Sequence, residues 1–255
     1  MTDQPRKITD DPYGAWQLVR RLVAEQASVY WRRYLLAFGL MAVGNGHRKS
    51  AILWLVVAMV LDGVDGPAAR AWHVSDHVPR IDGYTLDLII DYVTCIVIPV
   101  LFMHRFHMLP RHFSLIVGSF VLFMSALWMS RTDQMTDDHW FNGFPCEWNL
   151  VVPTLFLLDA DPWVTAAVCV ALSLTQFTDW KFVHPIRVHL LRPLNSAVTI
   201  LWLASVLVLT ATTPEFDGIG HWVLVACPVY MVGLGAWRTL SPRAATPAVE
   251  APDQQ

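Results

Sequence analysis

The sequence predicts an all-α integral membrane protein, with about eight transmembrane helices preceded by an amphipathic surface helix. Two observations lead to this class. Hydrophobic residues make up 55% of the 255 residues and charged residues only 15%, and the mean hydropathy is +0.41. Apolar blocks separated by short polar breaks run from about residue 34 to 239, leaving no stretch long enough for a separate soluble domain. We therefore expect one membrane domain over residues 33–240.

The two ends of the chain differ from this domain. Residues 1–32 are predicted to form a cytoplasmic or interfacial segment, because residues 11–31 place Trp16, Val19 and Leu22 on one helical face and Arg20 and Arg21 on the other. A solvated N-terminal helix is the alternative. The polar start lacks the apolar core of a cleavable secretory signal. Residues 241–255, rich in Ala, Pro and Gln, are predicted to be a disordered cytoplasmic tail.

Spanning segments are predicted near residues 33–45, 50–72, 83–104, 113–130, 146–160, 162–178, 194–211 and 221–239. An even number of spans places both termini on one side of the membrane. With a cytoplasmic N-terminus, fourteen of the 18 Lys and Arg residues face the cytoplasm, and Arg48, Lys49, Arg105 and Arg111 lie outside. The bias of basic residues toward the inner side favours this orientation, and we expect a bacterial inner membrane.

Other composition features narrow the function. The net charge of -3 and the absence of Lys/Arg runs argue against nucleic-acid binding. The four cysteines, Cys95, Cys146, Cys169 and Cys227, stand singly in apolar surroundings. They are predicted to be packing residues and not zinc ligands or disulfide partners.

Carboxylates gather inside two predicted spans. A lone Asp at the centre of a membrane helix costs roughly 2.5 to 3.5 kcal/mol, so a group of them requires a partner. Asp62 is predicted to lie about 13 Å above the inner boundary, with Asp87 and Asp91 roughly 6 and 12 Å above it. Spacings of three and four residues place side chains on one face of a helix. Two such faces are predicted: one carries Asp62, Asp65, Gly66, Ala69 and Arg70, and the other carries Gly83, Asp87 and Asp91.

Four carboxylates at one depth repel one another unless a cation balances them. Carboxylate oxygens suit Mn²⁺ or Mg²⁺, and this set suits one or two ions; we expect two. Small residues leave room for a bulky group, and Arg70 offers a planar fork for phosphate. The chemistry is that of metal-dependent phosphoryl transfer, with a carboxylate that deprotonates an alcohol. A structural salt-bridged cluster and an ion pathway are the alternatives.

These residues fill the signature D-x2-D-G-x2-A-R, gap, G-x3-D-x3-D, and the chain thereby resembles the CDP-alcohol phosphotransferase family. The twelve-residue gap, 71–82, is longer than the family's usual one and resembles that of the bacterial subgroup that uses choline as acceptor. The stretches FNGFPCEWN (141–149) and KFVHPIRV (181–188) look like the same subgroup.

The resemblance implies roles for the signature residues. It implies that Asp62, Asp65 and Asp87 hold metal and that Asp91 completes the metal site and acts as general base. Contacts to the CDP group are implied for Gly66, Ala69, Arg70 and Gly83. It further implies CDP-diacylglycerol and choline as substrates, phosphatidylcholine and CMP as products, and a homodimer in the lipid bilayer.

Two inward loops offer candidates for the remaining contacts. Choline carries a quaternary ammonium, which aromatic faces and an acid can bind, and the loop 137–149 contains Trp140, Phe144, Glu147 and Trp148. Interface anchoring is the alternative role for these aromatic residues. The other loop contains Lys181, His184 and Arg187, which could hold a lipid phosphate or serve as positive-inside anchors.

Alternative functions remain open at this point. Another acceptor, such as serine, glycerol phosphate or an inositol compound, would suit the same metal site, although an anionic acceptor favours a basic pocket over an aromatic one. A divalent-cation transporter is the alternative outside the enzymes.

Overall fold

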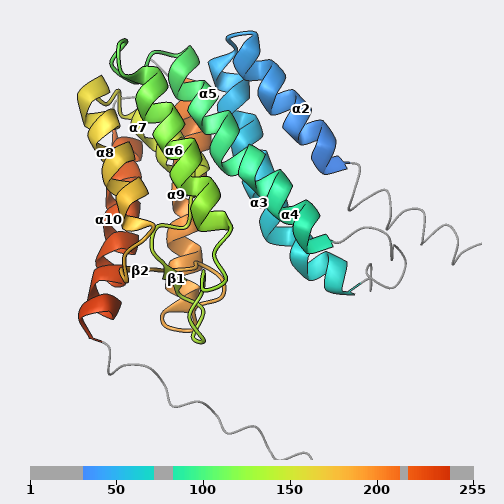
Figure 1. The fold of residues 1–255 in the computed structure, drawn as a ribbon, viewed down its shortest axis with the longest axis vertical. Helices are drawn as coiled ribbons and strands as arrows, with labels where there is room; N and C mark the ends of the chain where they lie inside the picture. The colour runs from blue at the N-terminus through green and yellow to red at the C-terminus, as the bar shows by residue number, and fades with distance from the viewer. Residues whose placement is uncertain (1–30, 72–82, 213–217, 242–255) are drawn as a thin grey trace, which may run out of the picture.

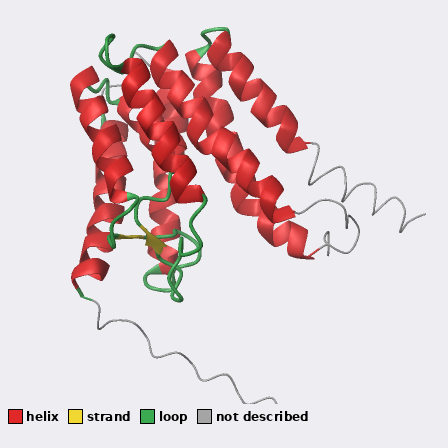
Figure 2. Cartoon of the chain, viewed as in Figure 1, coloured by secondary structure: helices red, strands yellow, loops and turns green. Residues whose placement is uncertain are grey.

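A computed structural model describes residues 31–71, 83–212 and 218–241 of the chain. Within these ranges helices are the dominant secondary structure, and loops with two short strands make up the rest (Figures 1 and 2). The surface helix predicted over 11–31 lies outside them except for its last residue, and the predicted tail lies outside them except for Ser241.

The helices are α2 (Trp31–Gly44), α3 (Arg48–Ala71), α4 (Gly83–Asp91), the π-helix η3 (Tyr92–Val97), α5 (Ile98–Arg105), α6 (Ser114–Met129), α7 (Trp148–Leu157), α8 (Pro162–Thr175), α9 (Arg192–Thr212) and α10 (Ile219–Leu240). Because α4, η3 and α5 follow without a break, the described part of the chain holds eight helical rods. Successive rods run in opposite directions along the bundle (Figure 1).

Three of these helices are long and apolar enough to cross a membrane, judged by length and composition: Asp87–Arg105, Arg192–Thr212 and Ile219–Leu240. Three shorter apolar helices accompany them, Ser114–Met129, Trp148–Leu157 and Pro162–Thr175. Large apolar side chains such as Leu115, Ile200 and Trp222 point outward and are exposed by 71%, 64% and 74%. The prediction of an all-α membrane protein is therefore confirmed, whereas the number of spans stays a prediction.

The core lies between the rods and is apolar with a few polar links. Phe102 of α5 meets Phe156 of α7 edge to face, with ring centroids 5.1 Å apart. Trp202 of α9 donates its indole N–H to the hydroxyl of Thr154 in α7 at 3.0 Å. Lipid tails are as apolar as the helix surfaces, so the hydrophobic effect does not drive helices together in a membrane. Interhelical hydrogen bonds such as this one stabilise the packed helix pair.

The cysteines pack as predicted. Cys146, Cys169 and Cys227 are buried, Cys95 is half-buried, and none of the four forms a disulfide. The thiol of Cys169 lies 3.6 Å from the sulfur of Met103 in the core. The burial of Cys146, Cys169 and Cys227 agrees with the prediction that the cysteines pack among apolar residues.

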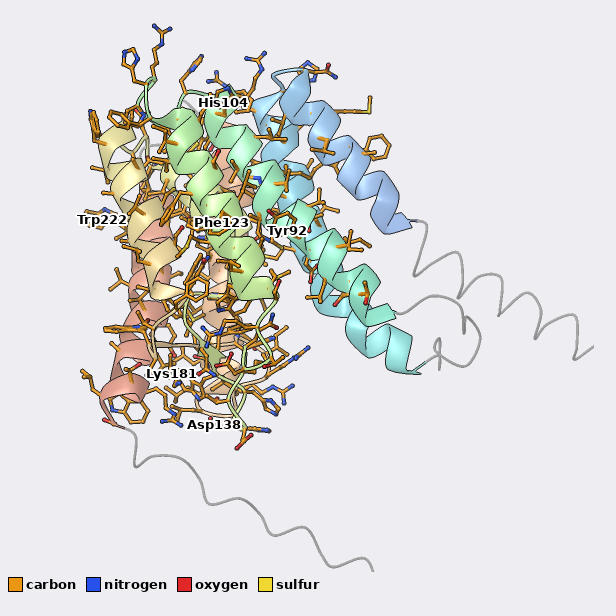
Figure 3. All side chains as sticks on the ribbon, in the orientation of Figure 1. Tyr92, His104, Phe123, Asp138, Lys181 and Trp222 are labelled. Carbon is orange, nitrogen blue, oxygen red and sulfur yellow. The ribbon has the colours of Figure 1, made fainter. Side chains whose placement is uncertain are left out.

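One end of the bundle carries two long loops, 130–147 and 176–191 (Figures 1 and 2). They are joined by a short antiparallel pair, β1 (Phe141–Asn142) and β2 (Lys181–Phe182), in which Asn142 faces Lys181. The pair packs against α10: the backbone N–H of Lys181 donates to the hydroxyl of Thr239 at 2.8 Å. Arg238 of α10 binds Asp138 of the first loop at 2.9 Å. Figure 3 shows Asp138 and Lys181 together at this end.

Candidate active site at the loop end of the bundle

The signature residues fall on two helices, α3 and α4, whose signature-bearing ends lie at this same end of the bundle (Figure 1). Asp62, Asp65 and Arg70 belong to the last turns of α3, and Asp87 and Asp91 belong to α4. The C-terminal end of α3 and the N-terminal end of α4 lie at the end of the bundle that carries the loops (Figure 1). Helix α3 also contacts η3, which directly continues α4. The fold thus brings the two halves of the signature to one end of neighbouring helices.

Two of the four predicted carboxylates have described side chains. Asp87 and Asp91 are half-buried and stand one turn apart on α4. The side chains of Asp62 and Asp65, and those of Ala69 and Arg70, lie outside the described set. Within that set no group of three or more His, Cys, Asp or Glu residues could hold a metal ion. The donor chemistry of Asp87 and Asp91 fits a hard divalent cation.

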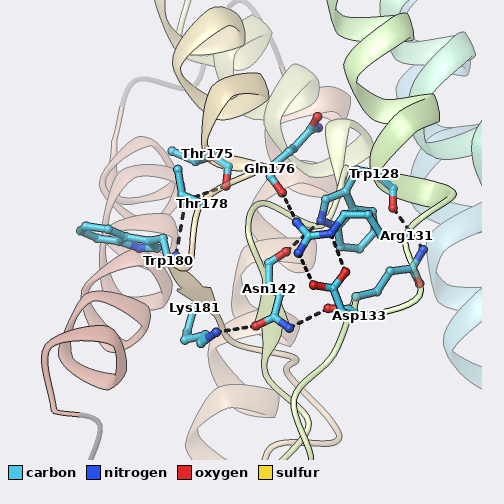
Figure 4. Close-up of polar contacts among 10 residues, drawn as sticks. Trp128, Arg131, Asp133, Asn142, Thr175, Gln176, Thr178, Trp180 and Lys181 are labelled. Carbon is cyan, nitrogen blue, oxygen red and sulfur yellow. Dashed lines mark hydrogen bonds and ion pairs between the residues drawn. The ribbon is translucent and has the colours of Figure 1, made fainter.

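A polar network joins the two loops to the helices above them (Figure 4). Arg131 is its centre: its guanidinium binds the carboxylate of Asp133 at 2.7 Å and donates to the backbone carbonyl of Gln176 at 2.7 Å. Asn142 donates to the carbonyl of Asp133 at 2.6 Å and accepts from the ammonium of Lys181. The loops are therefore held against each other by charged and amide groups from both.

Gln176 extends this network into the core. Its side-chain amide donates to the hydroxyl of Ser125 at 3.2 Å and to the sulfur of Cys146 at 3.3 Å. The side-chain oxygen of Gln176 is buried without a hydrogen-bond partner. The sequence assigned no role to Arg131, Asn142 or Gln176, although Asn142 lies in the quoted stretch 141–149. A single Arg, Asn or Gln in a loop carries no spacing that points to a distant partner.

The aromatic candidates for choline binding are buried. Trp148 is fully enclosed and donates its indole N–H to Ser125 at 2.9 Å. Phe144 packs edge to face on Trp148, with centroids 5.0 Å apart, whereas Trp140 packs with Val183 and Val188 in a separate cluster. Glu147 occupies the N-cap position of α7 and is half-buried. The structure thus groups Phe144, Glu147 and Trp148 and places Trp140 apart from them.

The phosphate candidates lie in the second loop. Lys181 binds Asn142, and Arg187 is exposed, with its guanidinium 3.8 Å from the sulfur of Met135. His184 stacks on Phe141 with ring centroids 5.3 Å apart, and its Nδ1 accepts the backbone N–H of Ile186 at 3.2 Å. Burial, with the nearby Arg187 and His139, lowers the pKa of His184 from 6.5 to about 4. His184 is therefore neutral at pH 7 and offers hydrogen bonding, not charge.

This lowered pKa predicts acid lability of the loop. Since the native state holds His184 neutral, stability is complete above pH 6.5 and falls as the pH drops toward about 4, where the unfolded chain binds the extra proton. We expect the thermal-unfolding midpoint in detergent to fall over this window, and to fall less in His184→Gln. His112→Gln, an exposed histidine outside the two loops, is the control and should keep the wild-type slope. Equal slopes in all three proteins would contradict the assignment.

Gly143 is predicted to be required where the loops meet. Its φ is +78°, a conformation that L side chains rarely adopt, and a Cβ there would overlap the carbonyl oxygen of Gln176. We expect Gly143→Ala to cost on the order of 1–3 kcal/mol of stability and to reduce activity. Gly233→Ala is the matched control, since a Cβ at Gly233 meets nothing within 4 Å. Thermal unfolding of both variants checks this, and an unchanged Gly143→Ala midpoint would disprove it.

Comparison with known proteins agrees with the signature. Residues 27–237 match the CDP-alcohol phosphatidyltransferase family. The chain is 37% identical over 205 residues to the phosphatidylcholine synthase of Pseudomonas aeruginosa, which covers 80% of this chain and 86% of that protein. It is 35% identical over 192 residues to that of Brucella melitensis (72% and 70%), and 33% identical over 203 residues to that of Rhizobium johnstonii (78% and 84%). The chain therefore belongs to the CDP-alcohol phosphatidyltransferase family.

Proposed function

We propose that this chain transfers the phosphatidyl group of CDP-diacylglycerol to choline, forming phosphatidylcholine and CMP. The observation that carries the proposal is the complete signature on the end of α3 and on α4, two helices at one end of the bundle. The similarity to three phosphatidylcholine synthases over most of the chain supports choline as the acceptor.

The carboxylates take the following parts in this proposal. Asp62, Asp65 and Asp87 would hold two divalent ions, Mn²⁺ or Mg²⁺. Once bound, these ions neutralise the diphosphate and stabilise the charge that develops at the transferring phosphorus. Asp91 completes the ligand set and accepts the hydroxyl proton of choline as its oxygen attacks. The bond from phosphorus to CMP breaks, and CMP leaves with the electron pair.

The small residues and the arginine of the signature bind the nucleotide. Gly66, Ala69 and Gly83 leave space for the CDP group against the helices, and Arg70 forms paired hydrogen bonds to phosphate. We expect Arg70→Lys to weaken CDP-diacylglycerol binding about tenfold or more, because an ammonium does not replace a planar fork. Titration of CDP-diacylglycerol onto the purified variant measures this. Wild-type affinity would remove Arg70 from the site.

The loops supply the proposed contacts to the rest of the substrates. Glu147 and the aromatic faces of Phe144 and Trp148 are the proposed choline pocket, and access to the enclosed rings requires the loop to open. Trp140, which the sequence predicted with them, lies in a separate cluster and is left out of this pocket. Lys181 and Arg187 supply positive charge for the lipid phosphate, and His184 adds a hydrogen bond. These assignments are supported by residue type and by the common position of the two loops.

The proposed setting is a bacterial inner membrane. The eight rods are proposed to be spans, with both termini cytoplasmic and the two loops and the signature on the cytoplasmic side, as the distribution of Lys and Arg favours. Two copies of the chain are proposed to form a homodimer. Nucleic acid has no place in this proposal.

The decisive experiment identifies the lipid that the enzyme makes. Purified protein is incubated with CDP-diacylglycerol, Mn²⁺ or Mg²⁺, and labelled choline, serine, glycerol phosphate or inositol. We expect choline alone to yield a labelled lipid, with an equal amount of CMP. A product from another alcohol would transfer the assignment to that acceptor. Metal flux into liposomes without CMP release from any alcohol would replace the enzyme by a transporter.

A further inference from the structure

The rod that carries Asp87 and Asp91 changes its helical geometry directly after Asp91. Residues Tyr92–Val97 form a π-helix between α4 and α5, and the backbone N–H of Ile98 donates to the carbonyl of Val93, five residues back. A π-turn holds about one residue more than an α-turn, is rare, and occurs often beside functional sites. Its position here is next to the proposed general base.

Side-chain hydrogen bonds support this π-helix at two points. The hydroxyl of Thr94, a buried residue, donates to the carbonyl of Ile90 one turn earlier at 3.0 Å. The hydroxyl of Tyr92 donates to the carbonyl of Leu122 in α6 at 3.1 Å. Helix α6 packs along η3, and Tyr92 lies at about the level of Phe123 of α6 (Figure 3). The start of the π-helix is thus tied to a neighbouring rod.

The extra residue decides which way α4 faces. Ile89 and Leu101 are twelve residues apart and both exposed, by 58% and 42%, while Ile90 and Phe102, also twelve apart, are both buried. In a continuous α-helix, twelve residues at about 100° each would leave such partners about 120° out of phase. One residue absorbed by a π-turn removes about 100° of this difference. Both halves of the rod can therefore present one common face to the core.

We propose that Tyr92 is a positioning residue, which fixes the rotation of α4 through its hydrogen bond to Leu122 and the π-helix that it begins. The inference rests on the proposed function, in which Asp87 and Asp91 hold metal and Asp91 takes the proton. A rotation of α4 turns both carboxylates relative to α3, so the tie at Tyr92 acts on the metal site without touching it.

Tyr92→Phe tests this role because it removes one hydroxyl and keeps the ring. Tyr230→Phe is the matched control: the Tyr230 hydroxyl donates to Asn195 at 2.8 Å between α10 and α9, so it too loses one hydrogen bond between two rods. Thr94→Val, which loses the bond to Ile90 at nearly constant volume, is a second test variant. Each is made in the full-length protein and purified in the same detergent.

Three measurements are compared: CMP release with choline, Mn²⁺ binding by electron paramagnetic resonance, which requires no turnover, and the thermal-unfolding temperature. We expect Tyr92→Phe and Thr94→Val to lower kcat about tenfold and weaken Mn²⁺ binding several-fold, with KM for CDP-diacylglycerol within about twofold. Tyr230→Phe should change the unfolding temperature by about as much as Tyr92→Phe does. It should leave kcat and Mn²⁺ binding within about twofold of wild type.

The outcomes separate the inference from the proposed function. An active wild type with unchanged kcat and Mn²⁺ affinity in Tyr92→Phe overturns the positioning role alone. Equal losses in Tyr92→Phe and Tyr230→Phe also overturn it, because they would reflect stability only. A wild type that releases no CMP with any alcohol overturns the proposed function. In that case weaker Mn²⁺ binding by Tyr92→Phe than by Tyr230→Phe would still support the role of Tyr92 in positioning Asp87 and Asp91, and equal binding would overturn it.

Discussion

Asp91→Asn is expected to abolish transfer to choline while CDP-diacylglycerol binding in the presence of Mn²⁺ stays within a few-fold of wild type. An amide has no comparable basicity, so the alcohol would keep its proton and the attack would fail. Asp91 occupies the last position of the predicted face of α4, next to the π-helix, where it is half-buried.

Two assays on one preparation give the answer. CMP release measures transfer, and titration of CDP-diacylglycerol measures binding. Binding that falls together with turnover would identify Asp91 as mainly a metal ligand. An active Asp91→Asn enzyme would exclude both roles. Asp159→Asn is the matched control, because Asp159 is exposed in the turn after α7, and Asn tolerates its positive φ of 49°.

Asp62→Asn, Asp65→Asn and Asp87→Asn should each lose metal-dependent turnover while the protein still inserts into the membrane. Removing a ligand weakens a site that the ion must occupy before the diphosphate binds productively. Loss of an outer-shell partner in metal sites costs roughly 10–100-fold, so we expect loss of a direct ligand to exceed about a hundredfold in kcat/KM.

The dependence of the rate on Mn²⁺ concentration makes this test specific. A lost ligand should shift half-saturation to higher Mn²⁺, and excess ion should restore part of the activity. A fold defect would not respond to the ion. If all three variants keep more than a small fraction of wild-type activity at ordinary Mn²⁺ concentrations, the carboxylates do not hold the metal.

The positions of the helices could be predicted because burial and apolar run length determine them. The predicted segment 162–178 corresponds to α8, Pro162–Thr175, which begins where Asp161 accepts the N–H of Trp163 at 2.8 Å. The segment 83–104 corresponds to one rod from Gly83 to Arg105. The π-helix within it could not be predicted, because an apolar run such as YVTCIV has the same composition in either helix.

The loop network could not be predicted for another reason. Its hydrogen bonds join residues far apart in the chain, as Arg131 and Gln176 show, and no periodicity records such pairs. Trp148 illustrates the ambiguity of aromatic residues in a polar loop: the same ring can bind a cation or fill a core. Its enclosed position and its bond to Ser125 give it a packing role in this structure, and its role toward choline stays a prediction.

The contact of β2 with α10 has a consequence for biosynthesis. Thr239 binds the backbone of Lys181, Arg238 binds Asp138, and Gly235 lets the Lys181 backbone approach the helix closely. Because a ribosome delivers the chain from its N-terminus, every other described rod is synthesised before these contacts can form. The two loops can contact α10 only after this last helix has been synthesised. A nascent chain that stops before Gly235 would therefore hold the signature residues and lack the contacts that fasten both loops to α10.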